Sequence, residues 1–476
     1  MRKAAAALLL LGLATAQPHA QEPARQQLHL SLQQGQVMAA HALNSGNPQL
    51  ALRITNALLQ ADRKNHSAWH LQAAAHAQTG NPGQGRKSAA RAFRFAQDDG
   101  SKYQMAQLAS RLAFQGGSPT LSQYWLRRTA IYAPDDKAEK LIAKDYETLR
   151  RINPWAFRLS GGVKPSSNVN NGSDTSISII DGVPETGSLL NPRSIALSGL
   201  VSTIDTSLGR RLRQSSTSET RLSGRLHLQR VALSPSAKSE AAAIVAARPG
   251  LPMPRNSDFA STYAELSLSH AFATGAPGSG GSARLALTAA TSWYGGEKSY
   301  DLIKSSASRS WQLSQSNRIS IFGSAEDRLN PRSAGYDANV YSLGASFSRT
   351  LFGGNVLNFT LGLRDNRSKF VNTTYKTATF RIGYDFEKPF GPAKVSSGLI
   401  LGQSEYSAFL NPIEGALLPK GRQDQSLYAD LNLFFEDYDY AGFAPMMRVR
   451  AGKRMSNLSL YAGTEFSVSL GIESKF

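Results

Sequence analysis

The chain contains no cysteine. This absence excludes disulfides, thiolate metal ligands, a cysteine nucleophile and a lipid-modified N-terminal cysteine. Long hydrophobic runs are also missing, because the apolar stretch at residues 4–16 is shorter than the about 20 residues that a transmembrane helix needs. No GxxxxGK[ST] phosphate-binding loop occurs either. Any membrane span must therefore be built from strands, and no nucleotide or other cofactor is expected.

Acidic residues are scarce, with 34 Asp and Glu against 53 Lys and Arg, for a net charge of +19. Such a charge is common in nucleic-acid-binding proteins. The N-terminus, however, reads as a secretory signal peptide, because Met1-Arg2-Lys3 precedes the apolar stretch and polar residues follow it. Cleavage after Ala16 and after Ala20 both fit, and we assign residues 1–20 to the signal. An exported protein meets anionic lipid and polypeptides, so nucleic acid is not an expected partner.

The C-terminal stretch alternates apolar with small or charged residues and ends on Phe476; its apolar members are Phe466, Val468, Leu470 and Ile472. Lipid offers no hydrogen bonds, so a strand with one apolar and one polar face spans a membrane only within a closed barrel. About fourteen such segments follow one another from Trp155 onward. The sequence therefore predicts an α+β multidomain chain whose second domain, residues 154–476, is a transmembrane antiparallel β-barrel in the outer membrane.

Charged residues fall mostly on one face of the alternating segments. In the segment Ala378–Phe386, the apolar set includes Phe380 and Ile382, while Arg381 and Asp385 point the other way. We expect Arg381, Asp385, Arg448 and Arg450 to face the lumen. The long connections at 165–193, 233–257 and 404–424 would then be external, and the short ones at 351–355 and 388–393 periplasmic. With an even strand count, both ends of the barrel are periplasmic.

Residues 21–153 form the first predicted domain, which is helical from about Gln33 to Arg151. Gly46-Asn47-Pro48 recurs as Gly80-Asn81-Pro82 after 34 residues, the tetratricopeptide period. A third motif, Gly116-Gly117-Ser118-Pro119, is out of register. Helical repeats present a concave surface that binds polypeptide, which predicts a periplasmic docking platform. A spacer that binds nothing is the alternative.

Basic residues of this domain have two interpretations: an attraction for an acidic client, or a solvated face. They are Arg86, Lys87, Arg91, Arg94, Arg127 and Arg128. His66 and His70, spaced i and i+4, have the spacing of metal ligands on one helical face, but no third ligand is evident. We therefore expect no metal site, and a solvated or packed histidine pair.

Three patches resemble the surface lipoprotein assembly modulator family, Slam. The first is Asn153-Pro-Trp-Ala-Phe157 followed by Ser167-Asn168-Val169-Asn170; the second is Tyr438-Asp-Tyr440-Ala-Gly442-Phe443-Ala-Pro445; the third is Ser456-Asn457-Leu-Ser-Leu-Tyr461. The resemblance implies delivery of lipoproteins, or of related unanchored proteins, to the cell surface. It implies a client lipoprotein or secreted protein as partner, with outer-membrane lipid, periplasmic chaperones and the barrel-assembly machinery, for a monomer without enzymatic activity.

The residues that carry the resemblance are Trp155, Ser167, Asn168, Asn170, Tyr438, Tyr440, Gly442, Phe443, Pro445, Ser456, Asn457, Tyr461 and the terminal Phe476. The aromatic ones also fit the interfacial girdles of a barrel, and the Ser-Asn pairs also fit turns. The other interpretation is a seam where the first and last strands close the barrel, and where opening would pass a lipid anchor.

Three other functions compete with lipoprotein delivery. Polysaccharide-export porins also join helical repeats to a barrel, although their repeat arrays are generally longer. A barrel-embedded hydrolase would use a serine with His227 or His270, but no spacing singles out a nucleophile, a base and an orienting group. A diffusion porin needs no helical domain.

Overall fold

A computed structural model describes residues 31–181, 183–275, 280–412, 415–418, 420–440 and 442–474. The predicted signal peptide and Phe476 lie outside the described residues. The chain divides into two compact units, Met1–Gln97 and Asp98–Phe476. Among the described residues, none of the helices combines the length and apolar character that a membrane crossing requires.

Seven helices precede the strands among the described residues. They are α1 (Leu32–Asn44), α2 (Pro48–Ala61), α3 (His66–Gln78) and α4 (Pro82–Phe95) in the first unit, and α5 (Asp99–Gln115), α6 (Pro119–Ile131) and α7 (Asp136–Ile152) in the second. The same turn joins α1 to α2, α3 to α4 and α5 to α6. Its glycines, Gly46, Gly80 and Gly117, have φ of 71°, 72° and 69°, where a side chain would be strained. A proline at the first helical position follows each turn.

The repeated motif of the sequence is therefore the turn of a helical hairpin. The third copy is out of register because α5 has 17 residues, whereas α1 and α3 each have 13. Small side chains let the helices of the first unit approach closely. Ala51 and Ala75 are fully buried, and a Cβ atom on Gly35 would lie 2.7 Å from Leu58 Cδ2.

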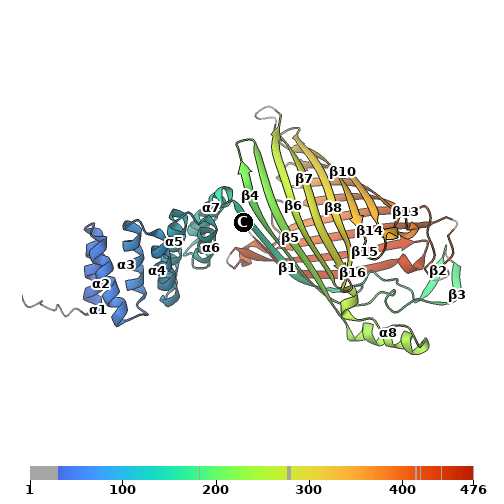
Figure 1. The fold of residues 1–476 in the computed structure, drawn as a ribbon, viewed down its shortest axis with the longest axis horizontal. Coiled ribbons are helices and arrows are strands. Elements are labelled where there is room, and N and C mark those ends of the chain that lie inside the picture. The colour runs from blue at the N-terminus through green and yellow to red at the C-terminus, as the bar shows by residue number, and fades with distance from the viewer. Residues whose placement is uncertain are drawn as a thin grey trace, which may run out of the picture. The chain divides into compact units, whose positions relative to one another are not determined.

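Fourteen antiparallel strands close into a barrel, as predicted (Figure 1). They are β1 (Trp155–Ser166), β4 (Gly199–Gln214), β5 (Ser218–Leu233), β6 (Ser261–Thr274), β7 (Gly281–Tyr294), β8 (Glu297–Gln312), β9 (Asn317–Leu329), β10 (Ala338–Thr350), β11 (Val356–Ser368), β12 (Tyr375–Asp385), β13 (Lys394–Tyr406), β14 (Arg422–Phe434), β15 (Phe443–Ser456) and β16 (Gly463–Ser474). Strand β1 lies between β4 and β16 and closes the barrel. The strands β2 (Ile177–Ile180) and β3 (Val183–Leu189) form a separate hairpin between β1 and β4.

The two faces of the barrel wall differ in chemistry. Arg450 Nε lies 2.6 Å from Asp430 Oδ1 across two neighbouring strands, and Arg381 approaches the same carboxylate. The alternate positions carry large apolar side chains that stay exposed, such as Leu361 and Leu470. A membrane barrel places its apolar face toward lipid, so the charged face lines the lumen. The predicted orientation of Arg381, Asp385, Arg448 and Arg450 agrees with this arrangement.

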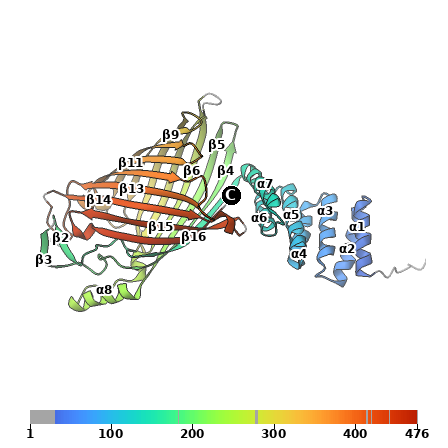
Figure 2. The same ribbon diagram turned by 180° about the vertical axis from the view of Figure 1, so that it is seen from behind.

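The two ends of the barrel also differ. At the end where β1 starts, which we call the turn end, connections are short, for example 215–217 and 351–355. At the other end, the loop end, connections 167–198, 234–260 and 407–421 are long, as predicted. The other connections at the loop end, 295–296, 330–337, 369–374 and 457–462, are short. Figure 2 shows β2, β3 and α8 (Pro235–Ala247) at the loop end.

Apolar side chains from the first two long loops form a small core at the loop end. Its buried members include Val169, Leu190, Ile195 and Leu197 from the first loop, with Ala237 and Phe259 from the second. Because this core packs on Val201, Val231 and Leu233 of β4 and β5, it attaches both loops to the barrel wall beside β1.

Candidate functional site

The seam between β1 and β16 is less extensively paired than the other edge of β1. Strand β1 pairs with β4 along its whole length, from Trp155 to Ser166. Its pairs with β16, in the described part of the chain, are Gly161 with Ile472, Gly162 with Gly471, Val163 with Leu470, and Ser166 with Ser467. Pro165 has no N–H to donate to a neighbouring strand. Among the described residues, the part of β1 nearest the turn end has its backbone pairs with β4 alone.

Glycines occupy the middle of this seam. Gly162 and Gly471 oppose each other, and a Cβ atom on them would lie 2.6 Å from Leu470 O and 2.8 Å from Gly161 O, respectively. Cross-strand side-chain pairs stabilise a sheet, and a pair of glycines contributes none. Two ion pairs flank the glycines, Arg158 with Glu473 at 3.4 Å and Lys164 with Glu465 at 2.8 Å.

At the loop end, the seam is covered by residues 167–181, which we call the strap. The strap follows β1 directly and crosses onto residues 457–464, which comprise the connection from β15 to β16 and the first two residues of β16. Asp174 accepts hydrogen bonds from Thr464 N at 2.8 Å and from Thr464 Oγ1 at 2.7 Å. Ser173 Oγ donates to Ser459 O at 2.5 Å. The strap is thus joined to the start of β16 and to the connection before it by bonds that do not belong to the barrel sheet.

The Ser and Asn residues of the first and third patches shape this crossing. Ser167 Oγ accepts a bond from Phe466 N at 3.1 Å, which continues the seam. Asn168 is buried and bonds both the N–H and the C=O of Gly172, at 2.8 and 2.9 Å. Asn170 accepts from Leu197 N and donates to two carbonyl groups of the same loop.

Asn457 performs the same role on the opposite side of the crossing. Its side chain accepts a hydrogen bond from Gln423 N at 2.9 Å and donates one to Gly421 O at 3.0 Å. Its backbone carbonyl accepts a bond from Asp181 N at 2.8 Å. Ser456 Oγ accepts from Leu458 N. These polar residues thus act as turn formers, and the turns they form join the strap to the last three strands.

Arg422 is a neighbouring residue that the sequence did not single out. Its guanidinium forms a bidentate bond with Asp424, and both side chains are 9% exposed. The rings of Tyr406, Phe409 and Tyr461 surround it, with centroids 4.4, 5.3 and 3.3 Å from Arg422 Cζ. Burial raises the pKa of the Tyr461 phenol, despite the nearby guanidinium. The only signal in the sequence is the Arg-x-Asp spacing, which places both side chains on one face of a strand.

The remaining patch residues lie at the turn end, so the three patches do not form one site. Trp155, Tyr438 and Tyr440 are exposed there, and Arg210 lies over the Trp155 ring at 5.3 Å. This is the arrangement of an interfacial aromatic girdle. Tyr461 is different, because it belongs to the buried cluster around Arg422.

Helix α6 contacts the second patch directly. Arg127 lies 4.5 Å from the Phe443 ring, 4.7 Å from the Tyr146 ring, and donates to Gly442 O at 3.3 Å. Asn153 is buried and bonds Thr120 and Gln123 of α6, while its Oδ1 accepts from Trp155 N at 3.0 Å. Pro445 O accepts from Phe435 N. The contacts of Arg127 and Asn153 attach α6 to β15 and to the start of β1.

The six basic residues of the helical domain do not form one free charged face. In the first unit, Arg91 stacks on Trp69 at 4.6 Å. In the second unit, Arg127 is held as described, and Arg128 lies over Tyr124 at 5.3 Å. Burial, and then the charge of His66, lower the pKa of His70. No cluster of three metal-ligating side chains occurs among the residues that the structure describes.

Arginines are abundant on the luminal face of the wall. Asp430 is shared by Arg381 and Arg450, at 3.6 and 2.6 Å. Glu219 is shared by Arg221 and Arg211, at 2.8 and 3.7 Å. Each of these carboxylates therefore faces two cations. Around Asp430 and Glu219, the luminal face therefore carries more positive than negative charges.

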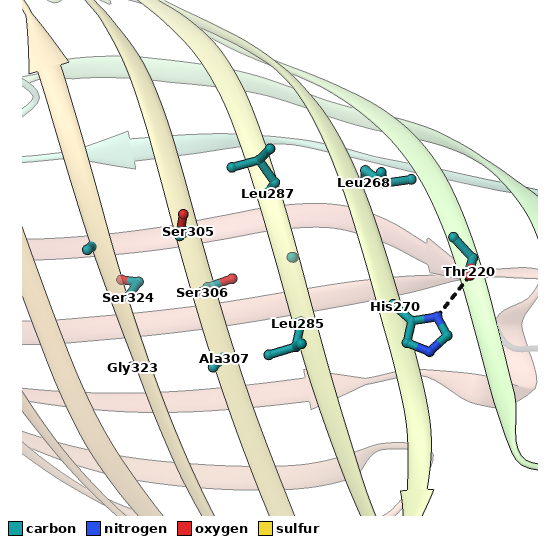
Figure 3. Close-up of a pocket in the computed structure, with 12 residues that line it drawn as sticks. Thr220, Leu268, His270, Leu285, Leu287, Ser305, Ser306, Ala307, Gly323 and Ser324 are labelled. Atoms are coloured by element: carbon teal, nitrogen blue, oxygen red, sulfur yellow. Dashed lines mark hydrogen bonds between the residues drawn. The ribbon is translucent and has the colours of Figure 1, made fainter.

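A groove of about 610 Å³ lies on the wall near His270 (Figure 3). Leu285 and Leu287 project at its edge, and small residues of β8 and β9, among them Ala307 and Gly323, form its floor. His270 Nδ1 lies 2.9 Å from Thr220 Oγ1. No carboxylate contacts His270 in the described ranges. The other candidate, His227, lies 3.4 Å from Asp205 but forms no described bond with a serine. Neither histidine belongs to the three-group arrangement that nucleophilic catalysis requires.

No protein-family model matches the chain, and no curated protein matches it. Among solved structures, OccAB3 from Acinetobacter baumannii is 9% identical over 67% of this chain and 98% of that one, with a TM-score of 0.35. An outer membrane channel from Pseudomonas putida F1 is 12% identical over 67% and 94%, with a TM-score of 0.32. The Yersinia enterocolitica type III secretion translocator chaperone SycD is 15% identical over 26% and 88%, with a TM-score of 0.23. These values are too low to assign a function.

The class of the protein follows from its own architecture. A closed antiparallel barrel of fourteen strands, with an apolar outer face and a charged inner face, is the fold of outer-membrane channel proteins. In this chain, helical hairpins precede the barrel and the strap covers the seam at the loop end.

Proposed function

We propose that the protein is an outer-membrane translocator that delivers lipoproteins, or related secreted proteins, from the periplasm to the cell surface. The turn end faces the periplasm in this proposal, because short connections are typical of that side. The helical hairpins, whose 34-residue period is that of tetratricopeptide repeats, dock the client there. The motif resemblance to the Slam family supports the same assignment.

The observation that carries the proposal is the uneven seam. A lipidated client must keep its acyl chains in an apolar environment while its polypeptide passes a polar lumen. A seam that is paired over few residues, has glycines at its centre and is strapped only at the loop end can separate from the turn end. Separation there exposes the lumen sideways to the inner leaflet, where the lipid anchor resides.

A disulfide across the seam tests this mechanism. The facing pair Val163→Cys and Leu470→Cys suits the test, because a Cβ at Gly162 or Gly471 would meet backbone at once. We expect oxidation to abolish surface delivery and reduction to restore it. The matched control joins Val163→Cys to Ser202→Cys on β4, across the fully paired edge of the same strand. Full delivery through a confirmed seam crosslink would exclude a lateral opening that separates Val163 from Leu470.

The client is found by labelling the surface of intact cells with a membrane-impermeant biotin reagent and comparing a deletion strain with its parent by mass spectrometry. Loss of one or a few lipoproteins from the surface, with normal amounts in whole cells, is the expected result. Loss of an extracellular polymer with an unchanged surface proteome would favour the second candidate, a polysaccharide-export porin. The positive excess of the lumen is the observation that favours that candidate, for an acidic polymer.

A further inference from the structure

The luminal charges are not balanced. Besides the two shared carboxylates described above, Glu326 faces both Lys304 and Arg328, at 3.3 and 2.7 Å. Three carboxylates are thus each divided between two cations. An ion pair with a shared carboxylate leaves net positive charge at the wall.

Other luminal arginines have no carboxylate at all within the described part of the chain. Arg284 opposes Ala271 and Ser308 in the sheet, and Arg318 opposes Gln312 and Ser348. Arg448 donates to the neutral side chain of Asn432. All three side chains are exposed, so water reaches them inside the barrel. They lie on β7, β9 and β15, near the turn end.

We infer that the lumen is an anion-selective conduit, whose half nearest the turn end binds multivalent anions. Apolar walls focus the field of unbalanced charges into the pore, which raises the local concentration of ions of opposite sign. Guanidinium groups bind carboxylate, phosphate and sulfate in bidentate fashion, so they retain polyanions better than chloride. This property does not depend on the identity of the client or on opening of the seam.

The first test is the reversal potential of the purified full-length protein in a planar bilayer under a potassium chloride gradient. We expect a chloride-to-potassium permeability ratio above one, which falls toward one as salt screens the wall charges. The triple variant Arg284→Gln, Arg318→Gln, Arg448→Gln should lower the ratio toward one. The corresponding glutamate variant should invert the selectivity.

Matched controls lie on the opposite face of the same wall. In the sheet, Arg309 on β8 opposes Ala283, and Arg349 on β10 opposes Asn317. Both arginines belong to the lipid-facing side of the wall. Replacing both with Gln should leave the permeability ratio unchanged. An equal change in this control, or a wild-type ratio of one or less, overturns the inference.

A second readout needs no ion current. Fluorescent dextran sulfate should bind the detergent-purified protein with an anisotropy change that the triple Gln variant reduces several-fold and the lipid-side variant retains. Neutral dextran of the same size should not bind. Equal binding of dextran sulfate to all three proteins would place the binding outside the lumen and contradict the proposal. Heat-modified migration on gels confirms that each variant retains a folded barrel.

Discussion

The asparagines of the first and third patches act through hydrogen bonds between their side chains and backbone groups. Asn168, Asn170 and Asn457 each satisfy both a donor and an acceptor of an irregular segment, because the amide group carries an N–H donor and a carbonyl acceptor at one position. Replacing one with alanine leaves buried backbone groups without partners, at a cost of about 1–3 kcal/mol per group. Their role in delivery would be indirect, through the conformation of the strap.

His70 gives a prediction at the residue scale. Burial lowers its pKa in the folded state, so the unfolded chain binds the proton more tightly below about pH 6.5. Stability from this group is complete above the unfolded pKa and is lost as pH falls through the folded pKa. We expect the helical transition of the full-length protein, followed by circular dichroism at 222 nm, to melt at lower temperature at pH 5.5 than at pH 7.5.

The variant His70→Gln should lose part of this pH dependence, because glutamine does not titrate. His41, an exposed histidine of α1, is the matched control, because burial and the charge of His66 are what lower the pKa of His70. An unchanged dependence in His70→Gln would show that another group controls the transition.

At the scale of elements, β1 has two unlike edges. One edge pairs with β4 over all twelve residues of the strand, and the other pairs with the described part of β16 at four positions. Beyond Ser166 the chain does not leave the barrel but continues as the strap over the β15–β16 connection. The strap therefore holds the loop end of the seam, and opening is easier at the turn end.

Removal of the Asp174 carboxylate should loosen the strap. Asp174→Ala leaves Thr464 N without its acceptor, and the loss of a hydrogen bond to a charged group corresponds to about 2 kcal/mol. We expect hydrogen exchange at Thr464 to accelerate by about one order of magnitude or more. Mass spectrometry of the peptide that spans residues 457–466 measures this.

The control for the strap is Asp181→Asn. Within the described part of the chain, the Asp181 carboxylate accepts a single bond, at 3.4 Å, and asparagine tolerates its left-handed backbone, with φ of 47°. Exchange at Thr464 should stay at the wild-type rate in this variant. Equal exchange in Asp174→Ala and wild type would mean that the apolar core of the loops, and not the polar bonds, holds the strap.

At the scale of the whole molecule, the compact units do not follow the change from helices to strands. Helices α5 to α7 belong to the unit of the barrel, and Arg127 and Asn153 attach them to it. The predicted domain boundary at residue 153 is a boundary of secondary structure. A truncation designed on that boundary removes helices that contact the barrel.

Two truncations separate docking from barrel integrity. Deletion of residues 32–97 removes the first unit alone, and we expect an inserted, heat-modifiable barrel with poor client delivery. Deletion of residues 33–150 also removes the contacts of Arg127 with Phe443 and Gly442, and should lower barrel stability in addition. Surface labelling of the client measures delivery, and gel migration measures folding. Undiminished delivery after deletion of residues 32–97 would show that the first unit does not dock the client.

Periodicity along the chain was sufficient to predict the barrel, because lipid forces a period of two on every membrane strand. It predicted fourteen strands, the lumen-facing arginines such as Arg381, and the long and short connections. The turns at Gly46 and Gly80 could also be predicted from the sequence. A left-handed turn favours glycine and the first position of the next helix favours proline, so the two residues recur together as a short motif.

Contacts between residues far apart in the sequence could not be predicted from periodicity or local motifs. Asp174 bonds Thr464 across 290 positions, and Arg422 is enclosed by rings from two separate segments, residues 406–409 and Tyr461. A strap of irregular backbone has no period, and its partners are decided by which strands the closed barrel brings together. For the same reason, the family patches, although ordered along the chain, are divided between opposite ends of the barrel. Closure of the last strand onto the first therefore determines the location of the seam and of the strap that covers it.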